Sequence, residues 1–128
     1  MTIEIERMAD LFDQETIDEM LEPVDDIRCC HYNAAMAAVN FDDWDMKYVE
    51  GYLGGHIGHA INSYKDSTGK EHYFDVTQEY YIMEGLKTDF DTSFEVIKAF
   101  SADEINDIFS RDGETHLVTT DIIKNREL

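Results

Sequence analysis

A thiol, an imidazole and a carboxylate occur in this sequence in the order Cys30, His59 and Asp75. In such a set the thiolate attacks a carbonyl carbon, and the imidazole forms an ion pair with it and later protonates the leaving group. The carboxylate fixes the tautomer of the imidazole. The three residues therefore predict nucleophilic chemistry on an acyl substrate.

Cys30 must be positioned by a helix that we expect over residues 28–40. This run is rich in alanine and small apolar residues on all sides, which is typical of a buried helix. Asp25 and Asp26 stand just ahead of it as caps, so Cys30 falls in the first turn, where free N–H groups favour a thiolate. Its neighbour Cys29 is interpreted as a core residue.

His59 and Asp75 must be positioned by a β-hairpin. They belong to β-rich runs at 56–64 and 71–83, separated by a tight turn at 65–70. His59 stands eight residues before Ser67 and Asp75 eight after it, so an odd-length loop would place them opposite each other. Their Cβ atoms would then lie about 5 Å apart, whereas an even loop would shift the register by one residue. Alternation puts Ile61 and Tyr73 on the face that His59 and Asp75 share, and we expect the alanine-rich helix to pack on that face.

The remaining pattern predicts the other elements of one domain of 128 residues. Further predicted elements are a helix at 13–22 with Asp13 or Thr16 as its cap, strands at 46–53 and 92–100, a helix from Ser101 with Glu104 in a capping box, and a final edge strand within 115–124. The run 71–83 is interpreted as one long strand or two short ones. The predicted fold class is α+β, with N-terminal helices packed on an antiparallel sheet.

Four short segments resemble the transglutaminase-like branch of the papain-like cysteine enzymes, which includes small phage and bacterial proteins. The segments are Cys30–Asn33, Tyr48–Tyr52, His59–Asn62 and Asp75–Thr77, and the resemblance covers roughly residues 28–80. It implies a papain/transglutaminase-like core in which a helix bearing Cys30 packs on a sheet bearing His59 and Asp75. The implied roles are nucleophile for Cys30, base and acid for His59, and orienting group for Asp75.

The resemblance also implies an oxyanion hole built from the backbone N–H of the cysteine and a side-chain donor, often a glutamine. Gln14 is the only glutamine upstream of Cys30, and its position does not assign it to the site. Other candidates are Asn33, Tyr48 and Asn62, while Glu50 points either to solvent or into the site. The chain departs from the family pattern at Ile61, where members commonly have an aromatic residue, and at Val76, where they often have proline. Neither change removes a reacting group. Gly51 is interpreted as a bulge or a point of close backbone packing.

The composition restricts the partners. Ten Lys and Arg against 29 Asp and Glu give a net charge of −19, so direct binding of nucleic acid is not expected. A monomer that attracts a basic protein or amine substrate is expected instead. The competing hypothesis is a non-enzymatic acidic binding or inhibitor protein of phage type, on a degenerate form of the same fold. It would mimic a polyanion such as DNA through acidic residues that include Asp18, Glu19, Asp103, Glu104 and Asp107.

No signal peptide or membrane-spanning run is recognised, so a cytoplasmic location is expected, in the host cytoplasm for a phage protein. Neither a cofactor nor a metal is expected. His56, His59, Cys29, Cys30 and His31 are residue types that bind zinc, but adjacent cysteines do not easily share one tetrahedral ion, and His56 and His59 fall on opposite faces of the predicted strand. His31, His72 and His116 are interpreted as surface residues, and Tyr80, Tyr81, Phe90 and Phe94 as core residues.

Overall fold

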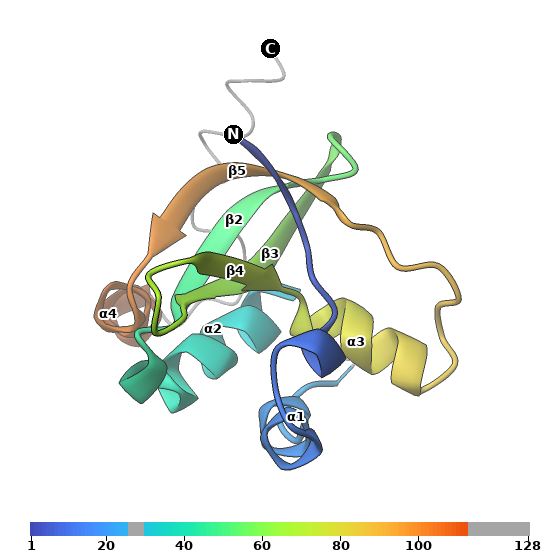
Figure 1. The fold of residues 1–128 in the computed structure, drawn as a ribbon. Coiled ribbons are helices and arrows are strands. Elements are labelled where there is room, and N and C mark those ends of the chain that lie inside the picture. The colour runs from blue at the N-terminus through green and yellow to red at the C-terminus, as the bar shows by residue number, and fades with distance from the viewer. Residues whose placement is uncertain (26–29, 113–128) are drawn as a thin grey trace.

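An antiparallel sheet of five strands with helices packed beneath it forms the fold, as the computed structural model of residues 1–25 and 30–112 describes it (Figure 1). The strand order is β1-β5-β2-β3-β4. The strands are β1 (Thr2–Glu4), β2 (Lys47–Leu53), β3 (Ile57–Lys65), β4 (Glu71–Phe74) and β5 (Ser93–Phe100). The helices are α1 (Gln14–Leu21), α2 (Cys30–Asn40), α3 (Val76–Met83) and α4 (Ala102–Asp112), with short 3-10 turns at Met8–Asp10 and Asp42–Trp44. The predicted α+β class is confirmed.

The β3–β4 hairpin has a register different from the predicted one. Its ladder pairs Asn62 with Phe74 and Ser63 with Tyr73, so its centre is Thr68 and not Ser67. The Asp66 carboxylate builds the turn, because its Oδ1 accepts hydrogen bonds from the backbone N–H groups of Thr68 and Lys70 at 2.8 and 3.1 Å. His59 and Asp75 are therefore not ladder partners, and the prediction that they face each other across the hairpin is wrong.

The second half of the run 71–83 is a helix. β4 ends at Phe74, and Asp75 caps α3 by accepting hydrogen bonds from Thr77 N and Gln78 N. The aromatic and β-branched residues of this run favoured a strand, but an Asp at an N-cap position satisfies two of the free N–H groups of the first helical turn. Asp75 consequently ends the strand and begins the helix.

Helix α2 packs on the face of the sheet opposite to the predicted one. Ala34 and Ala38 form a buried cluster with Tyr48 and Ala60, and Asn62 donates a hydrogen bond to Ala34 O at 2.8 Å. Small side chains allow the helix axis to approach the strands closely. The face of Ile61, which was expected to receive the helix, is filled by another cluster.

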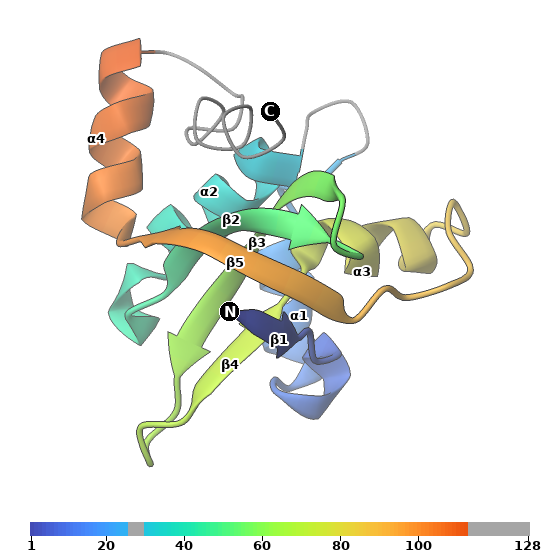
Figure 2. The same cartoon turned by 90° about the horizontal axis from the view of Figure 1, so that it is seen from above.

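The N-terminal segment covers this second face. Ile5 N donates to Thr92 O at 2.7 Å and Glu6 N donates to Tyr73 O at 2.8 Å, so the segment passes from the start of β5 to the β4 edge of the curved sheet (Figure 2). Ile5 packs there against Ile61 and Phe94. The sheet is thereby covered on both faces.

Several predicted boundaries are confirmed. Asp13 caps α1 through Thr16 N, and Ser101 and Glu104 form the reciprocal bonds of a capping box at 3.0 and 3.1 Å. The strand predicted at 92–100 is β5. Asp26, Cys29, His116 and the edge strand predicted within 115–124 lie outside the described residues. Within the described part, no helix combines the length and apolar character that a membrane crossing requires.

Gly51 marks both a bulge and a close approach, as predicted. The β2–β5 register shifts between Glu50 and Gly51, and a Cβ atom at Gly51 would lie 1.9 Å from Glu95 O. Gly51 is the ladder partner of His59 on β3. Absence of a side chain here lets β5 approach β2 next to the imidazole.

Candidate active site

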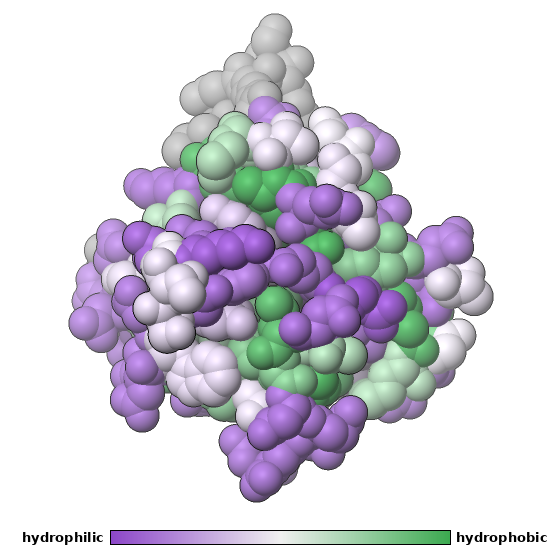
Figure 3. All heavy atoms as spheres, in the orientation of Figure 1, coloured by the Kyte–Doolittle hydropathy of each residue, from purple (hydrophilic) through white to green (hydrophobic). Residues whose placement is uncertain are grey.

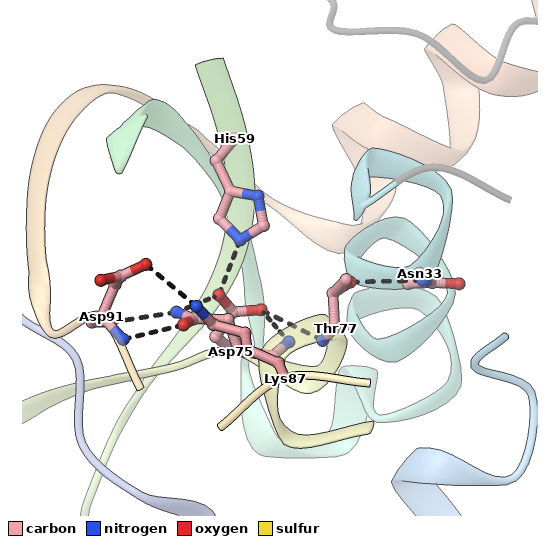
Figure 4. A network of polar contacts seen from close by, with 7 residues as sticks. Asn33, His59, Asp75, Thr77, Lys87 and Asp91 are labelled. Carbon is pink, nitrogen blue, oxygen red and sulfur yellow. Dashed lines mark hydrogen bonds and ion pairs between the residues drawn. The ribbon is translucent and has the colours of Figure 1, made fainter. Parts of the chain in front are cut away.

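His59 and Asp75 form a buried hydrogen-bonded pair (Figure 4). The Nε2 atom of His59 lies 2.6 Å from Asp75 Oδ2, and the two residues are 8% and 0% exposed. His59 lies on β3 beyond the end of the β3–β4 ladder, where the chain turns from β4 into α3. Asp75, the N-cap residue of α3, therefore contacts the His59 imidazole although His59 has no partner in the β3–β4 ladder.

Asp75 accepts hydrogen bonds at both carboxylate oxygens. Oδ1 accepts from Thr77 N at 3.0 Å and Gln78 N at 3.1 Å, and Oδ2 accepts from His59 and from Gln78 Nε2 at 2.9 Å. Burial by itself raises the pKa of Asp75, but the charge and hydrogen bond of His59, together with the bonds from Gln78, hold that pKa below its ordinary value. The carboxylate is thus kept ionised in a buried position.

Cys30 is the first residue of α2 and a partly buried free thiol. Burial lowers the pKa of His59, but the charge and hydrogen bond of Asp75, and then the hydrogen bond and charge of Cys30, outweigh it and raise that pKa to about 10. Since Nε2 is bonded to Asp75, the ring nitrogen available to Cys30 is Nδ1. The predicted catalytic residues Cys30, His59 and Asp75 are therefore brought together as a chain of thiol, imidazole and carboxylate.

Asn33 connects the helix of Cys30 to the helix capped by Asp75. Its Nδ2 donates to Thr77 Oγ1 and to Asp25 O, both at 3.2 Å (Figure 4). The side chain is 1% exposed, and its Oδ1 atom has no hydrogen-bond partner within 1–25 and 30–112. Both of its amide hydrogens are engaged, so Asn33 supports the site structurally and is not placed as an oxyanion donor.

The other predicted supporting residues are buried on the α2 side of the sheet. Asn62 Nδ2 donates to Ala34 O and to Lys47 O at 2.8 and 3.1 Å, which occupies its amide hydrogens. The Tyr48 hydroxyl donates a short hydrogen bond to Glu50 Oε2, and both side chains are fully buried. Glu50 therefore does not point to solvent. Gln14 is exposed on α1, where it bonds to Asp18 at 2.8 Å.

Gln78 is a site residue that the sequence analysis missed. It is 3% exposed and bonds to Asp75 from within the first turn of α3. A glutamine three residues after an N-cap Asp is a usable signal, but only once the segment is recognised as a helix. Interpretation of residues 71–83 as strand concealed it.

The remaining histidines differ from their expected positions. His31 is buried on α2, and His72 lies between Glu6 and Asp66 with its ring nitrogens 2.7 and 2.8 Å from their carboxylates. The prediction that both are surface residues is wrong for His31 and incomplete for His72. Phe94 is a core residue as predicted, whereas Tyr80, Tyr81 and Phe90 are only half-buried. Across the described ranges, the His, Cys, Asp and Glu side chains form no group of three suited to a metal ion.

Comparisons with family models, with curated proteins and with solved structures gave no match for this chain.

Proposed function

We propose that the protein is a cysteine-nucleophile acyl-transfer enzyme of the transglutaminase-like type, with a papain-like arrangement of helix and sheet. The observation that carries the proposal is the buried His59 imidazole, which is bonded to Asp75 through Nε2 and interacts with the Cys30 thiol. A carboxylate accepts but does not donate, so Nε2 carries a proton and Nδ1 faces the thiol. With Nε2 bonded to Asp75, Nδ1 is the nitrogen that can exchange a proton with the thiol, as a cysteine nucleophile requires of its base.

In the proposed reaction Cys30 Sγ attacks the carbonyl carbon of an amide, and the carbonyl electrons move onto oxygen. The C–N bond then breaks, and the amine leaves with a proton from His59 Nδ1, so that a thioester remains on Cys30. Water or an acceptor amine attacks the thioester, gives a proton to His59, and releases the thiolate. Hydrolysis, deamidation and transamidation are outcomes of the same intermediate, and the reaction requires no cofactor or metal.

The oxyanion of the tetrahedral intermediate would be stabilised by backbone N–H groups at the start of α2, beginning with that of Cys30. The first N–H groups of a helix have no intrahelical acceptor and point along the helix dipole. Asn33 and Asn62 use their amide hydrogens elsewhere, and the Tyr48 hydroxyl donates to Glu50. A backbone donor therefore fits the site better than any of these side chains.

A basic protein or an amine fits this proposal as substrate or acceptor. The net charge of −19 attracts cations over distances of about a Debye length, roughly 8 Å at physiological salt. Figure 3 shows hydrophilic side chains over most of the visible face, with apolar patches between them. Steering of this kind raises encounter rates and does not by itself specify a substrate.

Acylation by p-nitrophenyl acetate tests the proposal without knowledge of the natural substrate. Intact-mass and peptide mass spectrometry are expected to find an acetyl group on Cys30 that hydroxylamine removes. Cys30→Ala and His59→Ala should lose this adduct. Acetylation of lysines alone, or acetylation of Cys30 at the same rate without His59, would contradict the proposal.

A non-enzymatic polyanion mimic is the competing proposal. It is favoured by the exposure of five acidic residues on two outer helices, Asp18 and Glu19 on α1, and Asp103, Glu104 and Asp107 on α4. It predicts that charge reversal at these positions abolishes binding to a cationic probe such as polylysine, while Cys30→Ala changes no activity. Loss of acylation with Cys30→Ala would favour the enzyme.

A further inference from the structure

We infer that Gln78 is a positioning residue of the site, which holds the Asp75 carboxylate toward His59 and links it to the segment that precedes β5. This inference rests on the proposed function for its role in a reaction. Its geometry is independent of that proposal. Three hydrogen bonds of one buried amide carry the argument.

The first bond determines the position of the Asp75 carboxylate. Asp75 Oδ2 accepts from Gln78 Nε2 at 2.9 Å as well as from His59 at 2.6 Å, so two donors meet at the oxygen that orients the imidazole. Without Gln78, that oxygen would keep only the His59 bond among its partners in residues 1–25 and 30–112, while Oδ1 would still cap α3. A hydrogen bond to the charged form of a carboxylic acid favours that form. Gln78 therefore helps to keep Asp75 ionised opposite His59.

The other two bonds determine the orientation of Gln78 itself. Its Oε1 accepts from Asp91 N at 2.9 Å, and Nε2 donates to Asp91 O at 3.0 Å (Figure 4 shows Asp91 beside Asp75). A backbone N–H can only donate and a carboxylate can only accept, so the amide has one arrangement that satisfies all its neighbours. Glutamate at this position would place an oxygen against Asp75 Oδ2.

The contact with Asp91 extends to the other side of His59. Asp91 stands two residues before β5, and Phe94 on β5 packs its ring edge-on against the imidazole with the centroids 6.5 Å apart. Lys87 braces the same segment through an ion pair with Asp91 at 3.2 Å. Gln78 thus connects the carboxylate that orients His59 with the segment that leads to its ring contact.

The test is a pH titration of the His59 ring nitrogens by ¹⁵N NMR, which needs no substrate. In Gln78→Met, protonation of Asp75 is expected to perturb the His59 Nε2 signal about one pH unit higher than in the wild type. The matched control is Gln14→Met, because Gln14 is an exposed glutamine that bonds only to Asp18 among the contacts described. The control should titrate as the wild type does.

Gln78→Glu gives an independent readout. Its protonated carboxyl can donate to Asp75 at acid pH, whereas its ionised form repels Asp75, so the His59 signal should be native-like at low pH and perturbed near neutrality.

If Gln78→Met does not fold, Gln78→Asn, which keeps the amide on a shorter chain, is expected to show the same upward shift. An unmoved inflection in the folded variants would overturn the inference. A shifted inflection in a chain that is not acylated at Cys30 would instead contradict the proposed function alone.

Discussion

His59 Nε2 lies 2.6 Å from Asp75 Oδ2, although the two residues are not partners in the β3–β4 ladder. The contact forms because β4 ends at Phe74 and the next residue becomes the N-cap of α3. One carboxylate therefore begins a helix with Oδ1 and orients an imidazole with Oδ2. These two tasks can be separated by substitution.

Asp75→Asn is expected to keep the cap and lose the chemistry. An asparagine oxygen can accept from Thr77 N and Gln78 N, but its NH₂ group would then face the N–H of His59 and disturb the tautomer. We expect alkylation of Cys30 by iodoacetamide to slow at least about tenfold, with a loss of about 1–3 kcal/mol in urea unfolding. Asp13→Asn, at the exposed cap of α1, is the matched control and should change neither quantity appreciably. Alkylation of Cys30 at the wild-type rate in Asp75→Asn would contradict the orienting role of Asp75.

We expect His72 to contribute stability to the fold that is lost as the pH becomes alkaline. Hydrogen bonds with Asp66 and then Glu6 raise the pKa of His72, and its ring stacks on Tyr64 with the centroids 5.4 Å apart. Because the folded-state pKa exceeds that of the unfolded chain, about 6.5, the stabilisation is complete below that pH. It is lost as pH rises through the folded-state value.

Urea unfolding of the wild type and His72→Asn between pH 5 and 10 measures this contribution. The difference between the two proteins should be largest at acid pH and shrink on the alkaline side. His56→Asn, at an exposed histidine in the β2–β3 turn, is the control and should run parallel to the wild type. A difference in unfolding free energy between the wild type and His72→Asn that grows with pH would contradict a raised pKa of His72 in the folded state.

Asn33→Ala should loosen the attachment of α2 to α3. The change removes a buried donor of two hydrogen bonds and leaves Asp25 O and Thr77 Oγ1 without it. We expect a loss of about 1–3 kcal/mol in the free energy of unfolding. Asn40→Ala, at the exposed end of the same helix, should cost well under 1 kcal/mol. Equal losses of stability at the two positions would show that the Asn33 hydrogen bonds do not stabilise the attachment of α2 to α3.

Gly51→Ala should disturb the strand pair that carries His59. The new methyl group would lie 1.9 Å from Glu95 O, so β5 or β2 must shift. Overpacking of this kind costs about 1–3 kcal/mol, and we expect amide shifts in β5 in ¹H–¹⁵N NMR spectra. Gly55→Ala serves as a control with open space but a φ of +83°, so it should lower stability without moving β5. A native β5 spectrum in Gly51→Ala would refute the close approach.

The sequence predicted the parts of this fold that depend on local pattern. The cap at Ser101, the presence of a turn within 65–70 and the strands β2, β3 and β5 depend on nearby residues, and they were predicted correctly. For α1 the sequence left Asp13 and Thr16 as alternative caps, and Asp13 is the cap. The papain-like core and the enzymatic role stay predictions. Contact between His59 and Asp75 was anticipated for the wrong reason.

The errors arose where tertiary structure chooses between local alternatives. Residues 76–83 carry aromatic and β-branched side chains that suit a strand, yet the Asp75 cap and the end of the ladder make them a helix. Alternation places Ala60 and Ile61 on opposite faces but does not say which face receives α2. In the structure α2 packs on the face of Ala60, where Asn62 donates a hydrogen bond to Ala34 O. Gln78 could be found only after both choices were known.

The pH dependence of Cys30 alkylation tests the central claim most directly. The measurement uses Cys29→Ser, so that Cys30 is the single thiol, and compares it with the same chain carrying His59→Ala. We predict rapid reaction with iodoacetamide at neutral pH, and a loss of at least about tenfold at pH 7 in His59→Ala, with reactivity recovered only near the pH of an ordinary cysteine, about 8.5. Slow reaction at neutral pH that His59→Ala leaves unchanged would contradict a Cys30–His59–Asp75 site.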